Sequence, residues 1–144
     1  EKNILKTFKI LFLDYLEEKF IKIKEDRSTQ KNSRLKKFHE DLSKIKILDP
    51  ACGCGNFLIV AYRELRRLEI KVMKELYDPK QLSLDVNILS IITVNQFYGI
   101  ELNYFATRIA KIALWLVDHQ MNMELSDLFG VHYVRIPIHD IKTI

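Results

Sequence analysis

The chain has 144 residues, of which 48% are hydrophobic and 29% are charged, a composition typical of one globular domain. It contains no apolar run of the roughly 20 residues that a membrane span needs, and its first residues lack the pattern of a secretory signal peptide. These features predict a cytoplasmic protein without a membrane partner.

Basic residues are concentrated in the first third of the chain. The net charge is +4, and residues 1–48 carry 13 lysines and arginines against 8 acidic residues. This basic part is either a contact surface for a polyanion such as DNA or a solvated helix face.

Residues 1–44 are predicted to form an amino-terminal helical segment. Apolar residues recur at helical spacing from residue 3 to residue 25, which indicates one amphipathic helix. A polar break at residues 27–32 separates it from a second amphipathic helix over residues 32–43. Two helices therefore precede a second unit, residues 45–144.

The second unit alternates strands with helices. The expected elements are a strand at 45–48, a helix at 56–77, a loop at 78–87, an apolar segment of undefined type from Leu89 to Val94, a strand at 97–102, a helix at 104–121, a further turn from Ser126 to Gly130 and a strand at 133–136. The charged residues expected on the outer face of the helix at 56–77 are Arg63, Glu64, Arg66, Arg67, Lys71 and Lys74. This alternation predicts an α/β protein with a parallel sheet.

The stretch between the first strand and the first long helix reads Asp-Pro-Ala-Cys-Gly-Cys-Gly-Asn-Phe over residues 49–57. Glycines adopt backbone angles that other residues resist, and a strand, a glycine turn and a helix together bring a ligand against bare backbone. The stretch is not a dinucleotide fingerprint, because Leu58 stands where a third glycine would be expected. It also lacks the Gly-Lys-Ser/Thr sequence of a phosphate loop.

The chain has two cysteines, Cys52 and Cys54, and both lie in this stretch. A disulfide between residues this close would be strained, and their spacing matches neither a zinc site nor a Cys-x-x-Cys pair. Free thiols agree with a reducing cytoplasm. We therefore expect small packing groups here and no metal site.

The nine residues from Asp49 to Phe57 resemble the first S-adenosylmethionine-binding motif of DNA adenine methyltransferases. Tyr98-Gly99-Ile100-Glu101 resembles the second motif of the same enzymes. The separation of 46 residues between Gly55 and Glu101, and the helical sequences after both motifs, look like those of the large single-chain bacterial type IIG or IIL restriction–modification enzymes. These enzymes fuse nuclease, methyltransferase and DNA recognition. The resemblance implies a partial Rossmann-like class I methyltransferase fold, with parallel strands and flanking helices.

The resemblance implies S-adenosylmethionine as the cofactor. The implied binding residues are Asp49, Pro50, Ala51, Cys52, Gly53, Gly55, Asn56, Phe57, Glu101 and Leu102. Asp49 would lie near the methionine end, and Glu101 would accept hydrogen bonds from both ribose hydroxyls, as a carboxylate at a strand end can. Two plainer interpretations stay open: Asp49 bonded only to nearby amides, and Glu101 as a negative charge capping the helix that begins near Tyr104.

The catalytic residues of this family are not found in the chain. Adenine methylation in the family uses an Asn/Asp/Ser-Pro-Pro-Tyr/Phe motif, whereas the prolines here are Pro50, Pro79 and Pro137. The chain therefore resembles the cofactor-binding half of a methyltransferase domain, and we expect no methyl transfer from it alone. DNA is the expected partner through the parent protein, and an incomplete sheet with an open edge predicts self-association or poor solubility.

Two other functions remain open from the sequence. A non-catalytic α/β interaction module would use the glycine turn only to connect a strand to a helix. A methyltransferase that acts on RNA or protein would share the same cofactor motifs.

Overall fold

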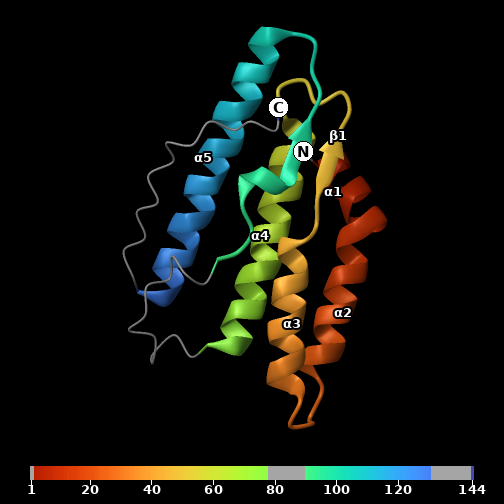
Figure 1. The fold of residues 1–144 in the computed structure, drawn as a ribbon, viewed down its shortest axis with the longest axis vertical. Coiled ribbons are helices and arrows are strands. Elements are labelled where there is room, and N and C mark those ends of the chain that lie inside the picture. Colours follow the sequence, from red (N-terminus) through yellow and green to blue (C-terminus); the bar gives the residue numbers. More distant parts are fainter. Residues whose placement is uncertain (1, 78–89, 131–143) are drawn as a thin grey trace.

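The computed structural model describes residues 2–77, 90–130 and Ile144. Its elements in chain order are α1 (Lys2–Phe8), the π-helical turn η1 (Lys9–Leu13), α2 (Asp14–Lys24), α3 (Lys31–Ser43), β1 (Ile47–Asp49), α4 (Asn56–Leu76), the 3-10 turn η3 (Val94–Gln96), β2 (Phe97–Gly99) and α5 (Tyr104–Phe129). The helices run side by side along the long axis of the molecule (Figure 1). The predicted loop at 78–87, Leu89 and the predicted strand at 133–136 lie outside the described residues.

The two predicted amino-terminal helices are confirmed, with a local departure in the first. α1, η1 and α2 form one continuous helical run over residues 2–24, in which η1 has π-type bonding. Between α2 and α3, the carboxylate of Asp26 pairs with Arg34 at 2.7 Å. The rings of Phe20 and Phe38 stack with their centroids 6.3 Å apart, which joins the buried faces of α2 and α3.

The two strands pair in parallel, with Asp49 opposite Gly99. Both are shorter than predicted. β1 begins two residues later than expected, because Ile45 N still donates to Leu42 O at the end of α3. β2 ends at Gly99, after which Ile100 N still donates to Asp49 O of β1 but Ile100 O accepts from Cys52 N in the turn that follows β1. The described residues thus form a mixed helix and strand fold with a parallel two-stranded sheet.

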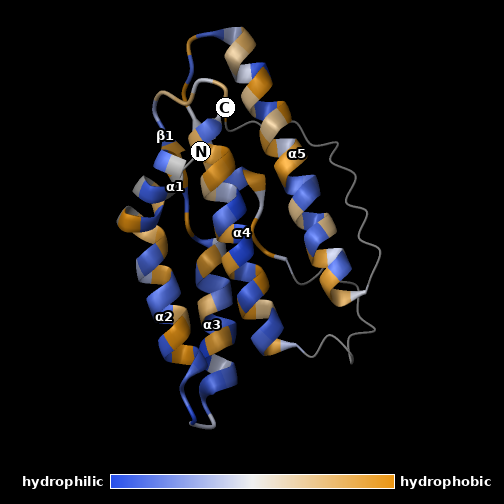
Figure 2. Cartoon of the chain, turned by 180° about the vertical axis from the view of Figure 1, so that it is seen from behind, coloured by the Kyte–Doolittle hydropathy of each residue, from blue (hydrophilic) through white to orange (hydrophobic). Residues whose placement is uncertain are grey.

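α4 is the central helix and packs against α1, α3, α5 and β2. Its buried side chains are Leu58, Val60, Ala61, Tyr62, Leu65, Arg66, Leu68, Glu69, Ile70, Val72 and Met73. The prediction that Arg66 lies on the outer face is therefore wrong, because its buried side chain pairs with Glu69 and donates hydrogen bonds to Ile92 O and Asn122 Oδ1. Tyr62 meets Phe97 of β2 edge-on with ring centroids 5.1 Å apart. Figure 2 shows hydrophobic and hydrophilic residues alternating around α2, α3 and α4, as expected for helices that bury one face.

α5 is longer than the sequence predicted. The expected end near Met121 and the separate turn at 126–130 are wrong, because one helix continues to Phe129. Its apolar face continues with it, since Leu125 and Phe129 are both buried. Gly130 ends the helix with a left-handed φ of 66°. No helix in the described ranges is long and apolar enough to span a membrane.

Candidate functional site

The turn between β1 and α4 is built on two glycines with left-handed backbone angles. Gly53 has a φ of 51° and Gly55 has a φ of 83°, a region that favours glycine over other residues. Gly55 N donates to Cys52 O at 2.8 Å, which closes the turn. Because glycine has no side chain that could cap the helix, the first N–H groups of α4 suit an anionic or polar ligand.

Glu101 lies at this glycine turn. Its Oε2 accepts a hydrogen bond from Gly53 N at 3.0 Å, and its Oε1 accepts one from Asn103 N at 2.7 Å. Cys52 N also donates to Ile100 O at 3.0 Å, so backbone bonds join the same two stretches. Each carboxylate oxygen can accept a second hydrogen bond, which leaves capacity for a ligand with two hydroxyls.

Asn103 is the capping residue of α5, and Glu101 is bonded to the backbone N–H of this cap, so the interpretation of Glu101 as a negative charge at the helix start stays open. Asn103 Oδ1 accepts hydrogen bonds from the N–H groups of Phe105 at 2.9 Å and Ala106 at 3.2 Å. The carboxylate of Glu101 thus lies between the glycine turn and the start of α5 and is bonded to both.

The carboxylate of Asp49 bonds locally. Its Oδ1 accepts a hydrogen bond from Ala51 N at 3.1 Å, which agrees with the plainer interpretation of this residue. The side chains of Pro50, Ala51 and Asn56 are exposed around the same turn. Asp49 therefore shapes the start of the turn at the end of β1.

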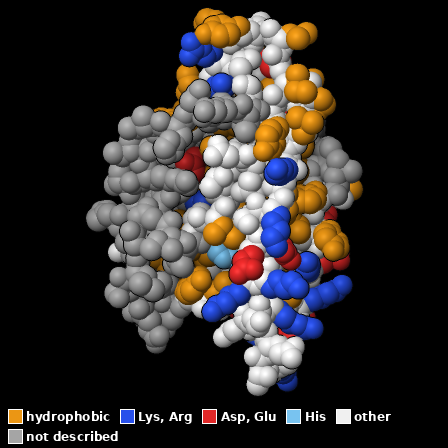
Figure 3. All heavy atoms as spheres, viewed as in Figure 1, with side chains coloured by type: hydrophobic (Ala, Val, Ile, Leu, Met, Phe, Trp, Pro, Cys, Tyr) orange, Lys and Arg blue, Asp and Glu red, His pale blue; other side chains and the backbone are white. Residues whose placement is uncertain are grey.

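Two apolar residues of the predicted set have opposite environments. Phe57 is half-buried and meets Phe8 of α1 edge-on, with ring centroids 6.0 Å apart. Leu102 is 99% exposed, and Tyr104 and Phe105 beside it are also exposed. Figure 3 shows hydrophobic side chains gathered at this end of the molecule. Phe57 thus joins the turn to α1, whereas the side chain of Leu102 is left almost entirely exposed.

Sequence reasoning missed the packing role of Gly99. A Cβ added at this position would lie 2.7 Å from Cys52 Sγ. Burial, and after it the carboxylates of Asp49 and Glu101, raise the pKa of the Cys52 thiol. Cys52 is therefore the neutral packing group that was expected, while Cys54 is exposed. Within the described part of the chain, no group of three or more metal-ligating side chains occurs.

Ala110 of α5 was also missed, although it touches the glycine turn. A Cβ added to Gly55 would lie 3.0 Å from Ala110 Cβ and 3.2 Å from its Cα. The only signal in the sequence is a series of alanines at 106, 110 and 113, at helical spacing on α5. A small residue at this position lets α5 support the turn from the side of the core.

We expect Gly55→Ala to lower the free energy of unfolding by about 1–3 kcal/mol, because it combines a left-handed φ with crowding against Ala110. Gly130→Ala is a matched control, since Gly130 has a φ of 66° but open space where a Cβ would lie. Urea unfolding of both variants measures the difference. Equal losses in the two variants would show that the turn is not tightly packed against α5.

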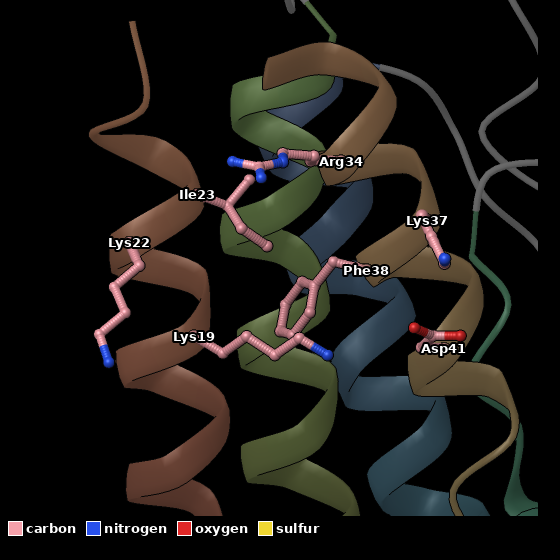
Figure 4. Close-up of a pocket in the computed structure, with 7 residues that line it drawn as sticks. All are labelled: Lys19, Lys22, Ile23, Arg34, Lys37, Phe38 and Asp41. Atoms are coloured by element: carbon pink, nitrogen blue, oxygen red, sulfur yellow. The ribbon is translucent and has the colours of Figure 1, made fainter. Parts of the chain in front are cut away.

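A separate groove lies between α2 and α3 (Figure 4). It has a volume of about 400 Å³ and is lined by Lys19, Lys22, Ile23, Arg34, Lys37, Phe38 and Asp41. Lys19 Nζ lies 5.6 Å from the centroid of the Phe38 ring, whereas Lys22 and Lys37 extend from opposite helices away from that ring. The groove contains no residue of the predicted cofactor site, and both interpretations of the basic amino-terminal part stay open.

Comparisons with known proteins agree on one family. The family described as MmeI, DNA-methyltransferase domain, matches residues 24–144. DNA methyltransferase A of Bacillus subtilis (strain 168) is 41% identical over 138 residues, which cover 95% of this chain and 15% of that protein. A putative type II restriction enzyme and methyltransferase of Methanocaldococcus jannaschii is 33% identical over 116 residues, which cover 80% of this chain and 10% of that protein.

A solved structure is also similar. It is the type IIL restriction–modification enzyme MmeI in complex with DNA, with a TM-score of 0.88 and 49% identity. The match covers 97% of this chain and 18% of that chain. The chain therefore spans less than one fifth of the length of each of these relatives.

Proposed function

The chain belongs to the MmeI family of DNA-methyltransferase domains, as its motifs implied, and on that premise we propose that it binds S-adenosylmethionine for a restriction–modification methyltransferase. One observation carries the proposal. The hydrogen bond from Gly53 N to Glu101 Oε2 joins the two motifs, 48 residues apart in sequence, in a single site.

The residues around the glycine turn fit this cofactor. The carboxylate of Glu101 can accept both ribose hydroxyls, because each oxygen already bonded to an amide retains a lone pair. The space around Gly53 is open, since no atom lies within 4 Å of the position of an added Cβ. Leu102 offers an exposed apolar surface for an adenine ring, and Asp49 and Asn56 would serve the methionine part. When bound, the cofactor supplies a methyl group activated on a sulfonium.

Adenine in DNA is the proposed methyl acceptor of the parent protein. The adenine-type first motif supports it, and DNA as the substrate is supported by two relatives, the MmeI enzyme solved in complex with DNA and the DNA methyltransferase of Bacillus subtilis. Because these two relatives are a DNA methyltransferase and an enzyme solved in complex with DNA, we propose neither an RNA or protein substrate nor a non-catalytic interaction module. The Pro-Pro motif of adenine methylation does not occur in this chain, so the catalytic residues would come from elsewhere in the parent.

The organisation of the parent domain is part of the same proposal. The two-stranded sheet would belong to the Rossmann-like sheet of a class I methyltransferase, with residues 1–44 as a helical segment before the cofactor-binding half at 45–144. Exposed apolar side chains along α5 support self-association of the chain on its own, and they are Phe105, Ile109, Ile112, Leu116 and Met123. The free thiols support a cytoplasmic location.

Isothermal titration of the chain with S-adenosylhomocysteine tests the proposal. We expect saturable binding of one ligand per chain, since one turn and one carboxylate form the site. We expect no methyl transfer to unmethylated DNA by the 144-residue chain, because it lacks the catalytic motif. The absence of binding at millimolar ligand would favour an interaction module. Methyl transfer by the chain alone would contradict the proposal that the catalytic residues lie elsewhere in the parent protein.

A further inference from the structure

The segment from Ser90 to Thr93, before η3 and β2, is held by a buried carboxylate. It has no regular secondary structure, and Ile92 is fully buried. The N–H groups of Ile91 and Ile92 both donate to Glu69 Oε1, at 2.7 and 3.1 Å. Ser90 Oγ donates to Glu69 Oε2 at 3.0 Å. One side chain of α4 therefore satisfies three donors of this short segment, two of which are backbone groups that need a partner when buried.

Arg66, which lies one turn before Glu69 on α4, is hydrogen-bonded to the same segment. Its Nη1 donates to Ile92 O at 3.1 Å and to Ser90 Oγ. Its Nη2 donates to Asn122 Oδ1 of α5 at 2.8 Å. Arg66 also pairs with Glu69 at 3.3 Å, and the side chains of both are fully buried. The segment is thus fixed to α4 through its donors and its acceptors together.

α3 contributes to the same network through His39. Its Nε2 lies 3.1 Å from Glu69 Oε1, and its side chain is 8% exposed. Burial alone would raise the pKa of Glu69, but the hydrogen bond with His39 and the charge of Arg66 lower it below its usual value. Glu69 therefore stays ionised and keeps its full capacity to accept hydrogen bonds.

Gln96 fixes the other end of the segment, where β2 begins. Its Nε2 donates to Leu42 O at 3.0 Å, in the last turn of α3, and to Ile45 O at 2.9 Å, between α3 and β1. Its Oε1 accepts a hydrogen bond from Thr93 N at 2.8 Å. Phe97, the first residue of β2, comes directly after it. One buried side chain thus connects the approaches to both strands.

These anchors matter because the ladder between β1 and β2 is short. It contains three residue pairs, beginning with Ile47 opposite Phe97. A shift of one residue in a strand moves its side chains to the opposite face, so a short ladder needs other contacts to fix its register. A shifted β2 would carry Glu101 away from Gly53.

We propose that Glu69, Arg66 and Gln96 are positioning residues for ribose recognition, because they fix residues 90–96, set the register of β2 and so hold Glu101 at the glycine turn. None of the three is hydrogen-bonded to the turn itself in the described structure. The inference rests on the proposed function, in which Glu101 binds the ribose.

The test compares two ligands, S-adenosylhomocysteine and its 2′-deoxyribose analogue, by titration of the full chain. The ratio of their dissociation constants is a ribose preference that loss of stability alone does not change. In Glu69→Met and Gln96→Met we expect this preference to fall about tenfold, the value of one charge-assisted hydrogen bond. Glu69→Gln should retain most of the preference, because its amide oxygen can still accept from Ile91 N and Ile92 N.

Leu13→Ala is the matched control, since Leu13 is a buried residue of η1, which packs mainly on α1 and α2, and its loss destabilises the fold in elements that carry no residue of this network. It should keep the wild-type preference when circular dichroism shows that the chain is folded. If Glu69→Met fails to fold, Gln96→Met, which removes no charge, decides the test alone. A wild-type preference in the folded Met variants overturns this inference only. No binding by the wild-type chain overturns the proposed function as well.

Discussion

Glu101→Ala is expected to weaken binding of S-adenosylhomocysteine by at least about thirtyfold, or roughly 2 kcal/mol, because a charged acceptor for two ribose hydroxyls is lost. The same change removes the acceptor of the bond from Gly53 N at 3.0 Å, so the turn keeps only the backbone bond from Cys52 N to Ile100 O as its hydrogen bond to the residues after β2. Both effects act in the same direction, which makes this the largest expected change in ligand affinity. Isothermal titration of the chain measures it.

Two comparisons separate ribose recognition from support of the turn. Glu124→Ala removes an exposed carboxylate of α5 away from the turn and should leave the affinity unchanged. The wild-type chain should prefer S-adenosylhomocysteine over its 2′-deoxyribose analogue, and Glu101→Ala should bind the two alike. If the variant binds both ligands more weakly but keeps the preference, Glu101 only supports Gly53. Unchanged affinity would remove its role altogether.

Periodicity predicted the helices well because each buries one continuous face. The expected range of 32–43 became α3 at Lys31–Ser43, and 56–77 became α4 at Asn56–Leu76. The strands were predicted less well, since three residues contain too few side chains to show alternation. The length of α5 was underestimated because Asn122 and Glu124 interrupt its apolar pattern, although Asn122 is buried as the acceptor of Arg66.

The motif predicted which stretches meet, but packing decided which other residues support them. Gly55 and Glu101 stood out because both lie in stretches that resemble the two cofactor motifs of this methyltransferase family. The contacts of Ala110 with Gly55 and of Gly99 with Cys52 join residues about 50 positions apart, and neither leaves a local pattern. Small residues in a helix or strand are common, so the sequence alone does not show which of them must be small. That becomes clear only when the atoms that face each residue are known.

Arg66 shows most clearly where a sequence pattern fails. Charge at helical spacing usually indicates a solvated face, and the neighbouring Arg67 is indeed exposed. Arg66 is buried because its partners come from residues 90–92 and from Asn122 of α5. The buried charge pairs with Glu69 of the same helix at 3.3 Å, but the hydrogen-bond partners at residues 90–92 and 122 cannot be read from that helix.

Arg66→Ala is expected to lower the free energy of unfolding by about 3–5 kcal/mol, because it leaves the carboxylate of Glu69 buried without the guanidinium that pairs with it at 3.3 Å. It also removes the donors to Ile92 O and to Asn122 Oδ1, which lie between α4 and its neighbours. Urea unfolding followed by circular dichroism measures the loss.

Arg67→Ala is the control that isolates burial from charge. Arg67 is the next residue of α4, it carries the same group, and it pairs with Glu64 at 2.8 Å while its own side chain is 48% exposed. Such a pair is screened by water, so this variant should unfold at nearly the wild-type urea concentration. Equal losses of unfolding free energy in the two variants would mean that the ionised form of Glu69 does not depend on Arg66. The network around residues 90–92 would then be stabilised by His39 and by the backbone donors of Ile91 and Ile92 alone.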